Sequence, residues 1–299
     1  CGANFSPIFS LYSDPTFALE SVMRNDRKRT PDLAVRYDAD EQHSLWRVTD
    51  ESQIRKCQDL LNGKPLFIAD GHHRYETALR YRDLLREQNP GYTGKELFNY
   101  ALMYFCNMED QGLMVFPTHR LVFGLADFDQ ASFLKAASKN FVIDPDQFDV
   151  EDPVSRKRVR STLAGKGKNC FAWYPGGGKV YLMKLRDEAV MDDYFPADAP
   201  KALKTLDVSV LHRLVIEEIL HISTDDQKNQ KSIEYVNAFD EALCAVHQGK
   251  AQMAFLMNPT RVAEVREVAN DGGKMPQKST YFYPKLLTGL VINKIVEDF

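Results

Sequence analysis

The chain has 299 residues, of which 44% are hydrophobic and 27% are charged, and these values exclude a disordered or fibrous protein. A net charge of −4 and a pI near 6.0 exclude a general electrostatic affinity for nucleic acid or for anionic membranes. No apolar run reaches the ~18 residues that a membrane-spanning helix requires, and we find no signal-peptide pattern. The length allows two domains of about 100 to 200 residues each.

The five cysteines are odd in number, widely spaced and without a Cys-x-x-Cys pair; they stand at positions 1, 57, 106, 170 and 244. This usage predicts free thiols in a reducing compartment, and therefore a cytoplasmic protein, rather than a disulfide framework or a zinc site. Cys1 has three readings: a processed lipoprotein cysteine, an N-terminal nucleophile, or the first residue of a chain whose natural start lies upstream. We favour the last of these.

The first sixty residues alternate short strands and helices. Apolar runs predict strands over residues 7–12, 33–37 and 44–48, with a polar loop at 38–42, and helical spacing predicts a helix over residues 15–24. Asp50 precedes a second helix as its cap, and Asn62 and Gly63 supply its stop signal.

The next stretch, Leu66 to Ala78, contains most of the functional information. Residues 65–69 are apolar and too few for a helix, whereas residues 75–85 place apolar side chains at helical spacing. The sequence therefore predicts a buried strand, a tight turn at Gly71 and a helix. The first amides of such a helix have no intrahelical partners and lie at its positive end, where an anion fits.

Five consecutive residues at this turn suit phosphate chemistry: Asp70, Gly71, His72, His73 and Arg74. Gly71 lets a ligand approach the main chain, and the forked guanidinium of Arg74 matches phosphate oxygens. We predict that Asp70, His72 and His73 are catalytic, with Asp70 as a base or a magnesium ligand. The structural alternative is that Asp70 caps the helix, the histidines bond to nearby carbonyls and Arg74 pairs with a carboxylate.

The chain then continues with strands over residues 98–107 and 113–116. The first is apolar on both faces, which predicts a central position in a sheet. His119 and Arg120 follow the second strand and are predicted to bind phosphate or nucleotide. The alternative for this pair is a solvated loop.

The second half opens near Gly124. Its predicted helices cover residues 128–137, 153–163, 208–220, 239–247 and 260–269. Asp127 precedes the first of these helices, and Asp207 is the predicted cap of the helix at 208–220. His212, within that helix, is expected to be a core or interface residue. Alternating residues 169–174 and 179–185 predict a hairpin around the three glycines at 176–178, and residues 141–144, 233–236 and 253–257 read as strands.

Residues 275–285 have no periodicity and are rich in lysine, hydroxyl and aromatic side chains. Long irregular segments of this kind inside a domain are usually functional. We predict that Lys278, Ser279 and Thr280 bind phosphate and that the segment lies within reach of the Asp70 turn, with Tyr281 or Tyr283 stacking on a ring of the ligand. The alternative is a linker whose aromatic residues pack in the core.

Four blocks of this sequence resemble the DUF1015 family of bacterial and archaeal proteins, whose activity is poorly defined. They are residues 4–12 (NFSPIFSLY), the Asp70 turn, residues 206–212 (LDVSVLH) and residues 275–285 (MPQKSTYFYPK). Residues 68–78 also resemble the glycine-x-histidine-arginine phosphate-binding turn of the ParB/sulfiredoxin superfamily, which includes the archaeal ADP-dependent serine kinase. Members of DUF1015 carry a further N-terminal section, so we expect its His-Glu and Asp-Arg elements upstream of Cys1.

The resemblance implies a mixed α/β fold of α+β character, with a ParB/sulfiredoxin-like lobe and its mixed sheet at residues 1–125 and a second α/β domain at 126–299. It also implies a small-molecule kinase that transfers phosphate from ADP, ATP or pyrophosphate to a hydroxyl acceptor, as a serine kinase does. We expect Mg²⁺ as a cofactor and a nucleotide and a small molecule as partners, without membrane or nucleic acid, and a homodimer stays open. The alternatives are a nucleotide-gated binding module of ParB type and a metal-dependent hydrolase using Asp70, His72, His73 and His119.

Overall fold

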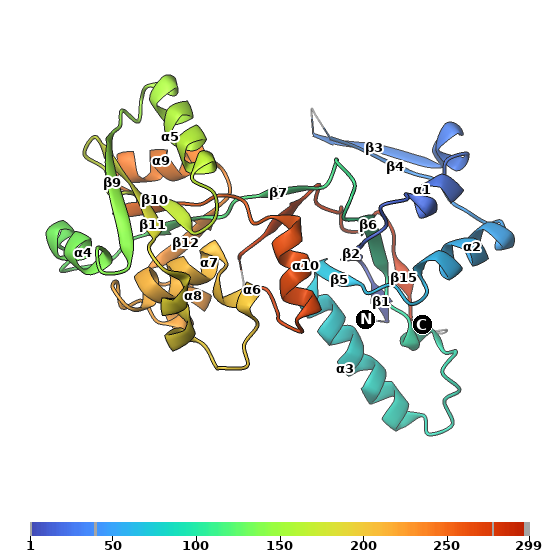
Figure 1. Ribbon diagram of the computed structural model, residues 1–299. Helices are drawn as coiled ribbons and strands as arrows, with labels where there is room; N and C mark the ends of the chain where they lie inside the picture. Colours follow the sequence, from blue (N-terminus) through green and yellow to red (C-terminus); the bar gives the residue numbers. More distant parts are fainter. Residues whose placement is uncertain (1, 39–40, 277, 296–299) are drawn as a thin grey trace. The chain divides into compact units, whose positions relative to one another are not determined.

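The computed structural model describes residues 2–38, 41–276 and 278–295, so Cys1 and Gln277 lie outside the described residues. The chain forms two compact units (Figure 1). Unit 1 comprises residues Cys1–Leu113 and Pro284–Phe299, and unit 2 comprises Met114–Tyr283. The mixed α/β composition agrees with the predicted fold class.

Unit 1 is built on a three-stranded mixed sheet, as predicted. Its central strand is β2 (Ile8–Tyr12), which pairs antiparallel with β5 (Phe67–Asp70) and parallel with β6 (Met103–Asn107). All five residues of β2 are buried. The predicted central position of β6 is wrong, because β6 is an edge strand, and the strand is shorter than residues 98–107 because residues 97–99 form a 3-10 turn. Tyr104 and Phe105 of β6 are 41% and 37% exposed, so an apolar run did not identify a buried strand here.

The remaining elements of unit 1 surround this sheet. They are β1 (Ala3–Asn4) with β15 (Asn293–Lys294), the hairpin β3 (Leu33–Asp38) and β4 (Glu41–Leu45), and helices α1 (Ala18–Val22), α2 (Glu51–Leu61) and α3 (His72–Gln88). Helix α2 begins as predicted, because the Asp50 side chain accepts a hydrogen bond from the Gln53 N–H. Helix α1 is shorter than predicted, since Asp14 accepts the Ala18 N–H and directs the start of the helix there. Strand β4 begins and ends three residues earlier than predicted.

Unit 2 contains one antiparallel sheet of six strands in the order β12, β8, β13, β10, β11, β9. The strands are β8 (His119–Val122), β9 (Phe141–Gln147), β10 (Cys170–Tyr174), β11 (Lys179–Leu185), β12 (Ile233–Val236) and β13 (Met253–Leu256). The β10–β11 hairpin is the one predicted around the three glycines. A wholly antiparallel sheet with helices on it makes unit 2 an α+β unit rather than a doubly wound one.

Both faces of this sheet carry a hydrophobic core. Trp173, Phe171 and Phe255 face α4 (Gln130–Ala137) and a helical segment at 207–217, whereas Ala172 and Leu256 face α5 (Pro153–Gly165) and α9 (Phe239–His247). The other α-helices of unit 2 include α6 (Lys201–Lys204), α8 (Thr224–Lys228) and α10 (Val262–Asn270). The cap of α4 is Asp129 and not the predicted Asp127, because Asp129 accepts the Ser132 N–H.

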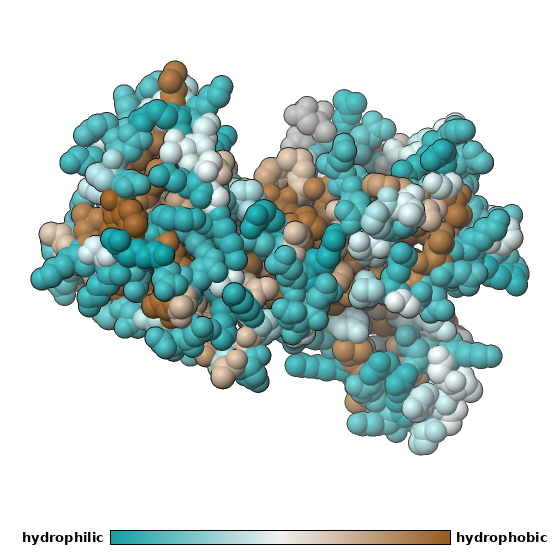
Figure 2. Space-filling model, in the orientation of Figure 1, coloured by the Kyte–Doolittle hydropathy of each residue, from teal (hydrophilic) through white to brown (hydrophobic). Residues whose placement is uncertain are grey.

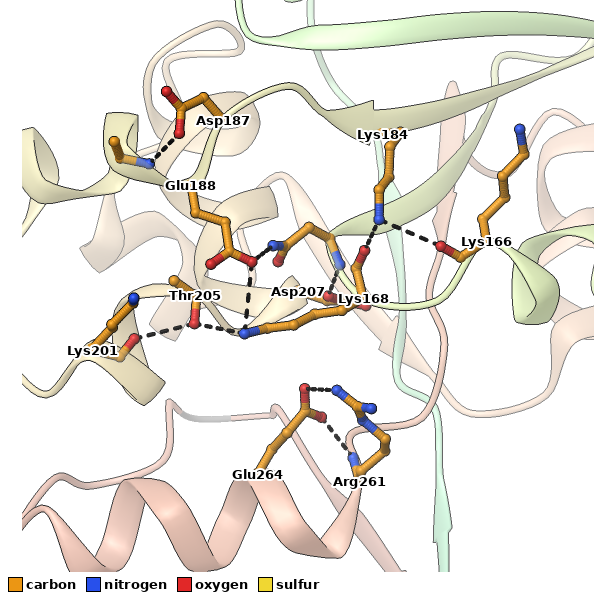
Figure 3. A network of polar contacts seen from close by, with 12 residues as sticks. Lys166, Lys168, Lys184, Asp187, Glu188, Lys201, Thr205, Asp207, Arg261 and Glu264 are labelled. Atoms are coloured by element: carbon orange, nitrogen blue, oxygen red, sulfur yellow. Dashed lines mark hydrogen bonds and ion pairs between the residues drawn. The ribbon is translucent and has the colours of Figure 1, made fainter.

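The helix predicted over residues 208–220 is interrupted. One α-helical turn, α7 (Asp207–Val210), passes directly into a π-helix, Leu211–Glu217. Asp207 is not a cap, because its carboxylate accepts the backbone N–H of Asn169, as Figure 3 shows. Lys168 lies in the same network and bonds to Thr205 (2.8 Å). Burial raises the pKa of Asp207 to about 6, against the lowering effect of the Asn169 N–H.

The chain passes between the units at two paired strands of unit 2. Strand β7 (Met114–Phe116) pairs with β14 (Tyr281–Tyr283), so part of the segment predicted as irregular is a strand. Residues after Tyr283 return to unit 1, where the Gly289 N–H donates to the Phe5 carbonyl. The compact units are therefore divided differently from the predicted domains of 1–125 and 126–299.

The surface is mainly polar, with scattered apolar groups on the face shown in Figure 2. None of the helices in the described part of the chain is long and apolar enough to span a membrane. The cysteines at 57, 106, 170 and 244 are free thiols, as predicted.

Candidate functional site

The predicted turn of unit 1 has the backbone that its sequence requires. Gly71 joins β5 to α3 with φ of 92° and ψ of 24°, a left-handed conformation that glycine adopts without penalty. The 17-residue helix α3 has no side-chain cap at its N-terminus. Its first amides, which have no intrahelical acceptors, lie at the positive end of the helix dipole, where an anion is favoured.

The Arg74 side chain folds back over this glycine. A Cβ placed on Gly71 would lie 2.9 Å from the guanidinium carbon of Arg74, so a side chain here would displace the guanidinium. Arg74 donates to the Ser6 hydroxyl (2.6 Å) and to the Pro7 carbonyl. Since a guanidinium has five N–H donors, these bonds and the one to Asp70 leave two of them for another acceptor.

Asp70 lies between two cations. Its carboxylate accepts from Arg74 at 2.9 Å and is 3.9 Å from the Lys285 ammonium, and its side chain is 45% exposed. Asp70 belongs to β5 and does not cap α3, so the capping alternative is wrong. Lys285, at the end of the 275–285 segment, thus lies beside the turn within unit 1.

The two histidines of the turn lie at the surface of unit 1. His73 is 90% exposed, and its Nδ1 is 3.6 Å from the Glu76 carboxylate. His72 is also exposed. Adjacent residues of a helix point about 100° apart, so the two imidazoles project in different directions. Both are accessible to a ligand from solvent, and neither is held rigidly by burial.

His119 and Arg120 do not lie in a solvated loop, so that alternative for the pair is wrong. Both lie in β8 of unit 2 and are only 1% exposed. The Nδ1 atom of His119 accepts the Met257 N–H at 3.0 Å, and burial, with the Arg120 charge, lowers the pKa of His119 to about 3. His119 is therefore a neutral core residue. Sequence reasoning missed this burial because His119 and Arg120 form the polar first half of the strand, before its apolar residues Leu121 and Val122.

The predicted residues 278–280 lie in unit 2 with Arg120. Arg120 donates to the Lys278 carbonyl at 3.1 Å, and the Ser279 carbonyl accepts from the Thr260 hydroxyl at 2.9 Å. The Ser279 hydroxyl is buried and has no hydrogen-bond partner among the described residues, and Thr280 is half-buried.

The aromatic residues that follow pack within unit 2. The rings of Tyr281 and Tyr283 lie against Phe116, with centroids at 6.3 and 5.3 Å, and Phe282 is buried. They stabilise the β7–β14 pair, and the expected stacking of a tyrosine on a ligand stays a prediction. The alternative of a packed linker holds for these three residues.

The predicted site residues thus fall into two groups. Residues 70–74, with Ser6 and Lys285, form a polar cluster in unit 1; His119, Arg120 and residues 278–280 belong to unit 2. Sequence reasoning missed Ser6, although it stands within the first block of the family resemblance, and it missed the contact between Arg120 and His212 (3.0 Å). Arg120 and His212 are 92 residues apart in the sequence, so neither position carries a local pattern that indicates this contact.

A resident metal ion fits this cluster poorly. In the described ranges, no three or more His, Cys, Asp or Glu side chains gather in a way that could hold a metal ion. Asp70 is the one carboxylate of the predicted set, and a cation there would compete with Arg74 and Lys285 for its oxygens. The alternative of a metal-dependent hydrolase has no support from this geometry.

Solved structures of similar proteins are distant. They include a conserved hypothetical protein from Pyrococcus furiosus, with 15% identity, a TM-score of 0.39, and coverage of 96% of this chain and 81% of that chain. They also include a free serine kinase in complex with AMP, with 14% identity, a TM-score of 0.38, and coverage of 94% and 87%. A variant of the free serine kinase in complex with ADP has 14% identity, a TM-score of 0.37 and coverage of 94% and 87%. Similarity at this distance gives no information on the ligand of this chain.

The sequence itself is informative about family. No curated protein matches it. The family model described as "Protein of unknown function (DUF1015)" matches residues 1–209, which is well over half of the chain. The Asn4 block, the Asp70 turn and the start of the Leu206 block all fall within the matched range. The chain therefore belongs to the DUF1015 family.

Proposed function

We propose that the Asp70 turn of unit 1 binds the phosphate groups of a nucleotide or of pyrophosphate. The observation that supports this most is the position of the Arg74 guanidinium, which lies over the left-handed Gly71 at the uncapped start of α3. Backbone amides, a positive helix end and a forked cation then converge at one place, and this combination is suited to phosphate oxygens.

The charges at the turn favour an anion. Arg74 and Lys285 place two cationic groups beside the Asp70 carboxylate. Arg74 is held in place by Ser6 and Pro7 and needs little reorganisation to accept a ligand. Preorganised donors of this kind lose less conformational entropy on binding.

We propose further that the bound phosphate is transferred to a small hydroxyl acceptor. The acceptor oxygen attacks the terminal phosphorus, the bond from that phosphorus to the bridging oxygen breaks, and the acceptor proton passes to the Asp70 carboxylate. Arg74, Lys285 and the α3 amides stabilise the charge on the transferred group and on the leaving oxygen. His72 and His73 are accessible donors for the same oxygens. Any Mg²⁺ enters with the phosphates, since the cluster holds no preformed metal site.

A second candidate is a binding module of ParB type without turnover. The ion pairs of Asp70 favour it, because they occupy the carboxylate oxygens that would otherwise contact the hydroxyl of an acceptor. If this candidate is correct, nucleotide binds and no phosphorylated product is released.

The experiment is a coupled assay of the full chain with ATP, ADP or pyrophosphate and a panel of small hydroxyl compounds, including serine. We expect phosphorylated product from the wild type and loss of turnover in Asp70→Asn with nucleotide affinity retained, because Asn cannot accept the proton. Glu87→Gln, at an exposed position near the C-terminal end of α3, is the control and should remain active. Equal turnover in Asp70→Asn and wild type would refute the catalytic role, and binding without product in the wild type would support the module.

A further inference from the structure

Unit 2 contains a cavity of about 250 Å³ that the turn in unit 1 does not use. Its wall is formed by the π-helix Leu211–Glu217, by α8 and by the segment before β14. The polar and aromatic side chains that line the cavity include Ser209, His212, Arg213, Gln227, Tyr235 and Lys278. π-helices are rare, and they occur frequently at functional sites.

A fully buried cation lies directly behind this wall. Arg120 contacts three wall residues: its Nε donates to His212 Nε2 at 3.0 Å, its Nη2 donates to the Lys278 carbonyl at 3.1 Å, and its guanidinium lies 5.5 Å from the centre of the Tyr235 ring. No carboxylate in the described ranges forms an ion pair with it. An unpaired buried charge is costly, so a compensating anion is expected nearby.

The His212 imidazole does not supply this compensation. Because Arg120 donates to Nε2, the ring proton of His212 is on Nδ1, which donates to the Gln227 side-chain oxygen at 2.6 Å. Burial, with the Arg120 charge, lowers the pKa of His212 to about 3, so the ring is neutral. The positive field of Arg120 therefore reaches the cavity through a neutral layer.

Lys278 adds a second positive charge to that of Arg120 at the wall of the cavity. Arg213 pairs with Glu217, and Lys228 is 3.6 Å from Asp225. Lys278 has no carboxylate partner in the part of the chain that the structure describes, and its backbone is left-handed with φ of 57°, which is uncommon for a residue with a side chain. With two pairs neutralised, Arg120 and Lys278 leave two positive charges that no carboxylate of the described residues compensates.

We propose that this cavity is a binding site for a phosphate group, separate from the Asp70 turn and independent of the proposed kinase reaction. Two uncompensated cations match a phosphate, which carries about −1.5 to −2 at pH 7, better than they match a monoanionic carboxylate. Lys278 contacts the phosphate oxygens directly. Arg120 acts from behind the wall by its charge and by holding His212 and the Lys278 backbone in position.

The test uses hydrogen–deuterium exchange of the full chain with inorganic phosphate, in an Arg74→Ala background that weakens the proposed site in unit 1. Sodium chloride at equal ionic strength is the reference. We expect phosphate to slow amide exchange in residues 209–217 and at Lys278 and Ser279, and Lys278→Gln to weaken this phosphate affinity about tenfold or more, as the loss of a charge-assisted contact predicts.

Matched variants separate charge from folding. Gln is one bond shorter than Lys but keeps a polar side chain and the left-handed backbone cost of Lys278. Lys278→Arg keeps the charge and should retain binding, and Lys274→Gln removes an exposed lysine outside the cavity. Protection that persists unchanged in Lys278→Gln, that sodium chloride produces equally, or that is absent altogether overturns the proposal. Stronger protection by acetate than by phosphate overturns the assignment to phosphate. None of these outcomes depends on phosphate binding at the Asp70 turn.

Discussion

At the scale of single residues, Gly71 determines what the turn can bind. Its left-handed backbone aims the first amides of α3, and its missing side chain leaves room for the Arg74 guanidinium. A neighbouring glycine allows these two effects to be separated. Gly63, at the end of α2, is also left-handed with φ of 76°, but a Cβ there would meet no atom within 4 Å.

We predict that Gly71→Ala and Gly63→Ala each destabilise unit 1 by about 1 to 2 kcal/mol, because both force a side chain into left-handed backbone. Only Gly71→Ala should also weaken pyrophosphate binding, by about tenfold, because its Cβ moves Arg74. Chemical denaturation measures the first effect and titration calorimetry the second. Pyrophosphate affinity that falls equally in the two variants contradicts a role of Gly71 beyond backbone geometry.

At the scale of elements, the sequence was informative where the signals are local. The Asp50 cap, the strand, turn and helix around Gly71 and the β10–β11 hairpin were all predicted, because capping, turn and alternation signals lie within a few residues of each other. The edge position of β6 was not predicted, because an apolar run shows only that a strand is hydrophobic and not which strands lie beside it. The π-helix was also missed, since its residues keep the apolar spacing of an α-helix.

The candidate site also combines features that are local in sequence, which could be predicted, with long-range contacts, which could not. Residues 70–74 are consecutive, so their clustering could be read from the chain. The contacts of Arg74 with Ser6 and of Asp70 with Lys285 join segments far apart in sequence. The burial of Arg120 depends on β12 and β13, which pair with β8 from more than one hundred residues away. Such contacts depend on the whole fold and leave no pattern at the positions themselves.

At the scale of the whole molecule, the chain leaves unit 1 and returns to it. The last described residues pair with the first, through β1 and β15, so unit 1 is completed only after unit 2 has been synthesised. A boundary placed at residue 125 could not foresee this return. Unit 2 holds the imidazoles of His119 and His212 in the neutral form, so the stability of unit 2 depends on pH.

We predict that unit 2 loses stability as the pH falls from about 6.5 towards 3. Burial lowers the pKa of both His119 and His212 from 6.5 to about 3, so the unfolded chain binds more protons than the folded one in this window. Stability that is present above pH 6.5 is therefore lost on acidification, by on the order of a few kcal/mol. Asp207, with its pKa raised to about 6, acts in the opposite sense between its ordinary 3.8 and 6, but it is one group against two.

The measurement is urea unfolding followed by Trp173, which is buried in unit 2, in a Trp46→Phe variant that removes the other of the two tryptophans. His212→Gln should flatten the pH dependence, whereas His247→Gln, at a half-exposed position, should not. A urea midpoint that stays constant between pH 6.5 and 4 is incompatible with two neutral buried histidines.

The central claim is that the Asp70 turn binds phosphate through Arg74, and calorimetric titration with pyrophosphate tests it most directly. The titration compares Lys278→Gln, in which the cavity of unit 2 is weakened, with the double variant Lys278→Gln, Arg74→Ala. A charge-assisted contact is worth about 1.5 to 3 kcal/mol, so we expect the double variant to bind pyrophosphate roughly ten- to a hundredfold more weakly. Equal pyrophosphate affinity in the two folded proteins would contradict the claim.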